Sequence, residues 1–578
     1  MAPVLDARHR LAPRQAVVGD RRRGLAGMLV MAMLVAGCAE IPTSGEVVEG
    51  DSVPEQLPVE VGFAPDKPTP GASETGIVQG FLEAMASYEA GYLTAGEFLT
   101  PDARSTWEPA DAMTIYAANP TVEKTSTGQV RLTLAVEAVI TQEAGYERRA
   151  PARSTELDLT LSKVDGEWRI VNPPAGVLVF EGDFESEFRE YNRYYYDADL
   201  EYLVPDPVYV PTQGNVASLL AEALVRGPSA WLAPAVVSAF PKGTTVPLPV
   251  RVEAGLAQVE LSAEASDGTS DDERELMTAQ LAWTLNQVGG IQQVVVRSDG
   301  LPLTDAAATA GPAENFAEFD PRRLNGGELY AITDTGVVVG ERLTPVAGAL
   351  GELPDLRAVA VDPQASRAAV VDSTGTQLLW APLDDSAEAS PLATGVDLGS
   401  ICWDRAGLVW AVDHAGGGSR ILVVEPGAES VPVRTPDALT TQHIEDLAVS
   451  PDGSRIAVAA GGDVLVGIVL RDTERAAAKI QGLRRIQLDE QTVSRVAWSG
   501  LTELAVLVDE SGQATEPFRV GLGGSDLSPA GPVQNAVDLA AAPAQELAVS
   551  TAEDELSKQS ATLRWVDVGA ATAPAYPG

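Results

Sequence analysis

The feature that most constrains the fold of this chain is a short motif that recurs through its C-terminal half. Each copy is a short apolar segment that leads into a turn, and a second apolar segment follows each clear copy. The copies are AVAVDP at residues 358–363, SICWDR at 400–405, DLAVSPDG at 446–453, RVAWSG at 495–500 and, more faintly, DLAAAP at 538–543. The pattern predicts pairs of adjacent β-strands, repeated along the chain.

The spacing of the motif predicts a β-propeller. Equivalent positions lie about 42–49 residues apart, in the order Asp362, Asp404, Ser450, Ser499 and Ala542. This interval is the length of one four-stranded blade, and closing such blades into a ring leaves no long free sheet edge. Residues 329–332 resemble the remnant of an earlier blade, so we expect five or six blades within residues 325–570. A β-sandwich is the main alternative, but it does not account for a regular motif.

Residues 189–305 read as a smaller α/β domain. An aromatic strand at residues 194–196 precedes a helix over 216–224, and Arg226-Gly227-Pro228 is a typical helix stop. A second helix precedes the strand at residues 294–296. The phrases that resemble the GerMN domain, an α/β module of bacterial envelope and sporulation proteins, are ALVRGP at 223–228, FPKGT at 240–244 and VELS at 259–262.

Residues 73–180 read as an α+β domain. Apolar side chains from Ile77 to Tyr88 fall at helical spacing, and a second short helix is expected just before Thr100. Alternate residues are then apolar over 130–140 and again over 157–161, which is the period of a half-buried strand. Helices followed by a curved antiparallel sheet resemble the nuclear-transport-factor-2-like fold. We interpret the pocket of this cone as filled by core side chains, with a ligand pocket as the alternative.

The N-terminal residues read as a lipoprotein signal peptide. Arginines at residues 21–23 precede an apolar run over 24–37, and Cys38 follows. A helix of roughly 14 residues spans only about 20 Å, short of the ~30 Å hydrocarbon core. The segment LVAGC that ends at Cys38 resembles a bacterial lipobox, which implies a diacylglycerol-modified, palmitate-bearing cysteine. We expect removal of residues 1–37 and anchoring through Cys38 on the extracytoplasmic face of the cell membrane. The alternative is an ordinary signal peptide with an incidental cysteine.

The segment between the anchor and the first domain reads as a tether. Residues 38–72 are acidic and rich in proline, and they carry neither helical nor strand periodicity. We expect this segment to hold the first domain away from the membrane.

Charge and cysteine content exclude several classes of protein. The formal net charge is −42, which argues against a nucleic-acid partner because phosphate binding needs clustered Lys and Arg. Cys402 is the one thiol left beside Cys38, so the fold cannot depend on disulfides. Cys402 lies in an apolar segment, and we interpret it as a buried, inert residue.

Catalytic and metal-binding patterns give no candidate. His9 lies in the signal peptide, and neither His414 nor His443 has a His or Cys at ligand spacing, so both are interpreted as solvated loop residues. The acidic run at residues 271–275 follows Ser270 with capping-box spacing, which favours a helix start over a calcium loop. We therefore predict no catalytic residue, no metal site and no cofactor.

The order of these parts resembles the LpqB lipoprotein family of actinobacteria. The most specific stretches are CAEIPTSG at residues 38–45 and the GerMN phrases. The resemblance implies a multidomain lipoprotein, with nuclear-transport-factor-2-like and GerMN domains before an all-β propeller. It also implies a non-enzymatic accessory factor that contacts the extracellular sensor domain of a membrane histidine kinase of the Mtr type, in signalling linked to cell-wall metabolism and division. The alternative is an envelope enzyme or glycan-binding propeller that acts on peptidoglycan.

Overall fold

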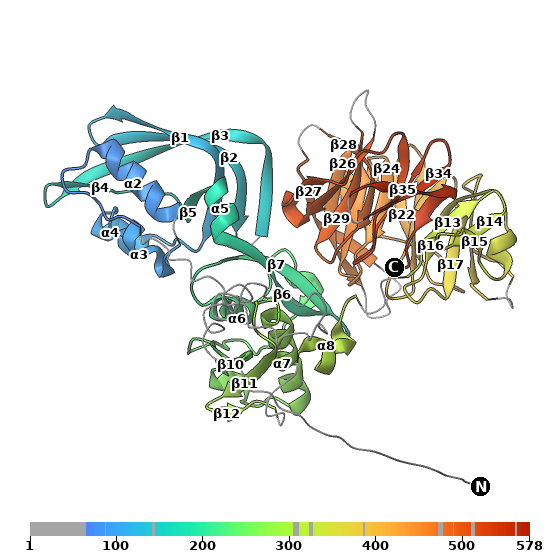
Figure 1. Ribbon diagram of the computed structural model, residues 1–578, viewed down its shortest axis with the longest axis horizontal. Helices are drawn as coiled ribbons and strands as arrows, with labels where there is room; N and C mark the ends of the chain where they lie inside the picture. Colours follow the sequence, from blue (N-terminus) through green and yellow to red (C-terminus); the bar gives the residue numbers. More distant parts are fainter. Residues whose placement is uncertain are drawn as a thin grey trace, which may run out of the picture. The chain divides into compact units, whose positions relative to one another are not determined.

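The computed structural model describes residues 65–578, except residue 87 and residues 142–144, 305–310, 323–326, 385–387, 472–477, 489–490, 510–514 and 561–562. An α+β region is followed by an α/β region and then by a series of four-stranded antiparallel sheets (Figure 1). This order confirms the multidomain fold expected from the sequence. Within the described part of the chain, no helix is long and apolar enough to span a membrane.

The first region is a curled sheet of five strands with helices packed against it. Its order is β4-β3-β2-β1-β5, and β5 runs parallel to β1. Register shifts in β1 and β2 bend the sheet. The strands are β1 (Ala112–Ser126), β2 (Gln129–Thr141), β3 (Gly145–Val164), β4 (Glu167–Ile170) and β5 (Val177–Phe180).

Side chains from helix α2 (Glu74–Ala86) fill the concave face of this sheet. Ile77, Phe81 and Met85 share one core with Val130 and other alternating residues of β2. This packing favours the interpretation that core side chains fill the pocket of the curled sheet. The second expected helix is a single turn, α3 (Leu93–Gly96), after the 3-10 turn η1 (Ala90–Tyr92) and before α4 (Pro101–Thr106). The region ends with α5 (Glu181–Glu187).

The α/β region contains two small sheets and two longer helices. One sheet has the order β7-β6-β8, and the other has the order β12-β11-β10-β9 with β10 parallel to β11. As expected, Ser270 and Glu273 form a capping box at the start of α7, so the acidic run is a helix N-terminus. The elements are β6 (Phe188–Asp197), β7 (Leu203–Pro211), α6 (Val216–Arg226), β8 (Val236–Val237), β9 (Arg251–Glu253), β10 (Leu256–Leu261), α7 (Asp271–Leu285), β11 (Gln293–Ser298) and β12 (Leu301–Pro302).

The described residues of the C-terminal half form six four-stranded antiparallel sheets. The first sheet combines β13 (Tyr330–Thr333), β14 (Gly336–Val339) and β15 (Thr344–Pro345) with the last strand of the chain, β36 (Thr572–Ala575). The next two are β16 (Leu356–Val361), β17 (Arg367–Asp372), β18 (Gln377–Pro382) and β19 (Ser390–Thr394), then β20 (Leu398–Trp403), β21 (Val409–Ala415), β22 (Gly418–Val424) and β23 (Val431–Pro432).

The last three sheets repeat the same order of strands. They are β24 (Ile444–Val449), β25 (Arg455–Ala460), β26 (Asp463–Arg471) and β27 (Ala478–Ile486), then β28 (Thr492–Trp498), β29 (Glu503–Asp509), β30 (Glu516–Gly521) and β31 (Ser528–Pro529), and finally β32 (Ala536–Ala540), β33 (Ala548–Thr551), β34 (Glu555–Gln559) and β35 (Trp565–Ala570). Each sheet is one blade of a propeller.

The repeated polar residue of the motif accepts hydrogen bonds in the turn between the first two strands of a blade. The buried Asp362 carboxylate accepts bonds from the backbone N–H groups of Ser366 (2.6 Å) and Arg367 (2.9 Å). Asp404 accepts from Leu408 N (3.0 Å) and from the indole of Trp410 (2.6 Å). Both carboxylates are buried, and the N–H donors of the turn replace the water that each has lost.

Candidate functional site

The innermost strand of each blade lines the centre of the propeller. β16, β20, β24, β28 and β32 contact one another in this order, and β36 contacts both β32 and β16. The six inner strands therefore form a closed ring around a central pocket of about 340 Å³. Strand geometry points alternate residues into this pocket. In β28, for example, Arg495 and Ala497 are partly exposed, whereas Val496 and Trp498 are buried with the blade core.

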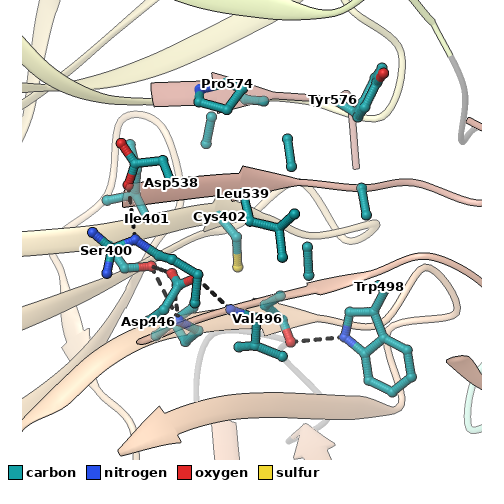
Figure 2. Close-up of a pocket in the computed structure, with 18 of the residues that line it drawn as sticks. Ser400, Ile401, Cys402, Asp446, Val496, Trp498, Asp538, Leu539, Pro574 and Tyr576 are labelled. Atoms are coloured by element: carbon teal, nitrogen blue, oxygen red, sulfur yellow. Dashed lines mark hydrogen bonds and ion pairs between the residues drawn. The ribbon is translucent and has the colours of Figure 1, made fainter. Parts of the chain in front are cut away.

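Four consecutive inner strands place a polar residue at the same position, and we call these residues the polar ring: Ser400, Asp446, Arg495 and Asp538. Asp446 joins three blades, because it accepts bonds from Ser400 Oγ (2.5 Å) on β20 and from Val496 N (2.9 Å) on β28. Its third donor is Leu447 N (2.9 Å). Figure 2 shows Ser400, Asp446 and Val496 joined in this way on one wall of the pocket.

The other half of the polar ring is an ion pair. Arg495 Nε donates to Asp538 Oδ1 at 2.8 Å, and Arg495 Nη1 donates to its neighbour Ser494 O at 2.9 Å. Asp538 also accepts a long bond from Ser550 Oγ (3.4 Å). Two of the five N–H groups of Arg495 are thus directed to protein acceptors, and the Asp538 carboxylate, with about four lone-pair sites, keeps accepting capacity.

Burial changes the acidity of two groups in the pocket. Loss of hydration raises the pKa of the Asp446 carboxyl above its ordinary value, against the opposing effects of Arg495 and of the hydrogen bond from Ser400. Burial also raises the pKa of the Cys402 thiol. Cys402 therefore stays protonated at neutral pH, which agrees with an unreactive cysteine. The sequence did not indicate that this thiol lines a cavity.

Two positions further along the inner strands lies a set of small side chains, here called the small-residue collar. Its members are Ala360, Cys402, Ala448, Ala497 and Ala540. Because none of them is longer than a cysteine, the centre of the ring stays open. Trp498 stands beside the collar, and its indole N–H donates to Ala448 O at 3.0 Å, across the gap between two blades.

The arrangement is suited to binding and offers no metal site. Among the residues that the structure describes, no group of three or more His, Cys, Asp and Glu side chains could hold a metal ion. The pocket volume lies at the lower end of the ~300–1,000 Å³ range of small-ligand sites, which combine apolar walls with a few convergent polar groups.

Two histidines that the structure describes lie together, which the sequence did not indicate. The rings of His414 and His443 stack with centroids 4.1 Å apart. His414 belongs to strand β21 instead of a loop, is half-buried, and shares a 2.9 Å hydrogen bond between Nδ1 and Ser419 Oγ. Burial and the neighbouring His443 lower the pKa of His414. Cys38, the predicted lipidation site, lies outside the described residues.

Comparison with known proteins accounts for the three parts of the chain. Residues 67–185 match the N-terminal domain of lipoprotein LpqB, residues 192–304 match the Germane domain of sporulation and spore germination, and residues 327–577 match the LpqB β-propeller domain. Lipoprotein LpqB of Streptomyces avermitilis is 31% identical, over 97% of this chain and 99% of its own length. The chain belongs to the LpqB lipoprotein family. Other LpqB lipoproteins are 30% identical over 95% of this chain and 97% of their own length in Thermobifida fusca, and 27% identical over 93% and 95% in Cutibacterium acnes.

Solved structures resemble this chain only distantly. A chain from the nidogen/laminin complex covers 44% of it, with 99% of that chain matched, at a TM-score of 0.34 and 9% identity. TolB from Acinetobacter baumannii covers 50% of it, with 84% of that chain matched, at a TM-score of 0.32 and 16% identity.

The polar ring could have been found from the sequence by aligning the repeats. Its four members are the first residues of four successive copies of the motif, and the earlier copy has Ala358 there. The turn residue and the apolar alternation define each copy, and only alignment at the turn brings these four side chains into one column.

Proposed function

We propose that this chain is a non-enzymatic accessory lipoprotein, held by a lipid on Cys38 at the extracytoplasmic face of the cell membrane. Its partner in this proposal is the extracellular sensor domain of a membrane histidine kinase of the Mtr type. By this contact it modulates signalling that controls cell-wall metabolism and division. The observation that carries the proposal is the match to proteins named lipoprotein LpqB over nearly the whole chain.

Two further observations support parts of this proposal. The apolar run that ends at Cys38 has the length and the small residues of a lipobox. The hydrogen bonds of the polar ring join blade to blade, as expected of a binding or scaffolding surface more than of an activated nucleophile. The partner itself is inferred from the family resemblance.

Copurification with the kinase sensor domain tests the proposal. The full-length lipoprotein, solubilised in detergent, is mixed with the tagged extracellular domain of the kinase, and with the extracellular domain of an unrelated kinase as control. We expect retention on the first domain only. Lipid anchoring raises the effective concentration of both partners at one membrane, so even micromolar affinity would suffice.

The alternative function predicts the opposite pattern. The central pocket with its polar ring is the observation that favours a glycan-binding or glycan-cleaving propeller. Retention of the protein on peptidoglycan, or release of soluble glycan, together with no retention on the kinase domain, would replace the accessory function with this one.

A further inference from the structure

The polar groups of the central pocket favour one kind of ligand group. Ser400 Oγ is directed to Asp446, Arg495 is directed to Asp538 and Ser494, and the Trp498 indole is directed to Ala448. A ligand that needs donors, such as a phosphate or a carboxylate, therefore competes with these protein acceptors. A ligand that donates hydrogen bonds meets the Asp538 carboxylate, of which 29% of the side-chain surface is exposed.

Charge favours the same kind of group. The charged residues that line the pocket are three acids, Glu445, Asp446 and Asp538, and two arginines, Arg357 and Arg495. The whole chain has a formal net charge of −42, which raises the local concentration of cations. A positively charged donor is therefore preferred over a neutral one.

The apolar residues that line the pocket restrict the shape of a ligand that can enter it. Opposite the polar ring, β16 and β36 present Ala358, Ala573 and Pro574, and the small-residue collar lies next along the strands. These side chains leave room for a slim apolar stem and offer it no side-chain hydrogen-bonding group other than the Cys402 thiol. A ligand with one charged end and an unbranched hydrocarbon stem matches this pocket, because the polar ring and the small-residue collar lie next to each other.

We propose that the central pocket binds a primary alkylammonium group, with the ammonium at Asp538 and Asp446 and the stem along the small-residue collar. The group could belong to a free small amine or to a lysine side chain of another protein. This binding is independent of the kinase contact proposed above.

Calorimetric titration of the full-length protein in detergent with n-pentylamine tests the proposal. We expect saturable binding of one pentylamine per chain at pH 7, and at least tenfold weaker binding of the neutral 1-pentanol. Asp538→Asn keeps an oxygen that can accept from Arg495 but removes the charge, so we expect an at least tenfold loss of affinity. Asp554→Asn, at an exposed turn of the same blade, is the matched control and should bind as the unaltered protein does.

A second variant and a second measurement test the proposal if Asp538→Asn does not fold. Ala497→Leu fills the collar without removing any member of the polar ring and should also reduce pentylamine affinity at least tenfold. Because the amine binds the folded state, saturating pentylamine should also raise the urea midpoint of the unaltered protein, and should raise that of Ala497→Leu less. Absence of saturable binding, or equal binding by the unaltered, Asp538→Asn and Ala497→Leu proteins, would overturn the proposal.

Nα-acetyl-lysine-N-methylamide identifies the source of the ammonium group. If it competes with pentylamine for the pocket, a protein lysine can enter the pocket. If pentylamine binds and the lysine derivative does not, the backbone next to a lysine is excluded and the ligand is a free amine. Both results support binding of an alkylammonium group in the central pocket.

Discussion

At the scale of single residues, the centre of the propeller depends on one carboxylate that three blades share. Asp446 accepts hydrogen bonds from Ser400, Leu447 and Val496, although burial raises its pKa. The three donors oppose this effect of burial, because they replace part of the lost water. The same residue is therefore part of the candidate site and part of what holds neighbouring blades together.

Asp446→Ala should destabilise the protein. The substitution removes the acceptor of Val496 N–H and of the Ser400 hydroxyl, whereas Leu447 N–H can still donate to Ser400 Oγ at 3.2 Å. An unsatisfied buried donor costs about 1–3 kcal/mol. Urea unfolding followed by tryptophan fluorescence measures the change, with Glu429→Ala at an exposed loop position as the control. A variant as stable as the Glu429→Ala protein would show that these bonds contribute nothing to the association of the blades.

The stacked histidines predict a loss of stability in mild acid. The pKa of folded His414 lies below the ordinary value of 6.5, first because of burial and second because of His443. Below pH 6.5, residue 414 then binds more protons in the unfolded than in the folded state, so its contribution to the free energy of unfolding falls as the pH falls. The decrease, followed by urea titration between pH 7.5 and 5.5, should be smaller in His414→Gln. Equal slopes in both proteins would contradict the prediction.

At the scale of elements, closure of the ring depends on the last strand of the chain. β36 pairs with β13, which lies about 240 residues earlier in the sequence, and it contacts the inner strands β32 and β16. It also lies beyond residue 570, where the sequence motif led us to end the propeller. A blade made from both ends of the repeat region connects the first and last sheets without any further covalent bond.

Deleting residues 572–578 should open the propeller. The truncated protein would lose the inner strand of one blade, expose the edge of β13, and unfold at lower urea concentration with self-association. Deleting only residues 577–578 retains β36 and serves as the control. Size-exclusion chromatography and urea unfolding measure both properties, and a truncated protein that stays monomeric and equally stable would exclude a closing role for β36.

At the scale of the whole molecule, the net charge and the proposed lipid anchor determine how the protein lies near the membrane surface. The formal net charge of −42 keeps the chain soluble and repels anionic polymers. A diacylated cysteine would hold it at the membrane, because two acyl chains suffice for stable anchoring.

Cys38→Ser should separate anchoring from folding. Without the thiol, no diacylglycerol can be attached, so we expect the protein in the culture medium or as uncleaved precursor. Labelling with radioactive palmitate should mark the unaltered protein and not the variant, while Cys402→Ser should be labelled normally. Mature-length Cys38→Ser protein that stays in the membrane fraction would contradict the anchor.

What the sequence alone determined were the features set by neighbours along the chain. Apolar side chains at every second residue predicted the strands. Ser270 and Glu273 predicted the start of α7, and the repeated Asp362 and Asp404 marked turns of the blades. These patterns are readable because their hydrogen bonds and buried faces involve residues only a few positions apart.

Only the tertiary structure decided which distant residues meet. The four members of the polar ring come from strands more than 40 residues apart, His414 and His443 stack only after two blades pack, and β36 finds β13 only when the ring closes. Such contacts depend on the summed rotation from blade to blade, which no short-range pattern records. The sequence thus predicted a propeller, and its three-dimensional closure made the pocket.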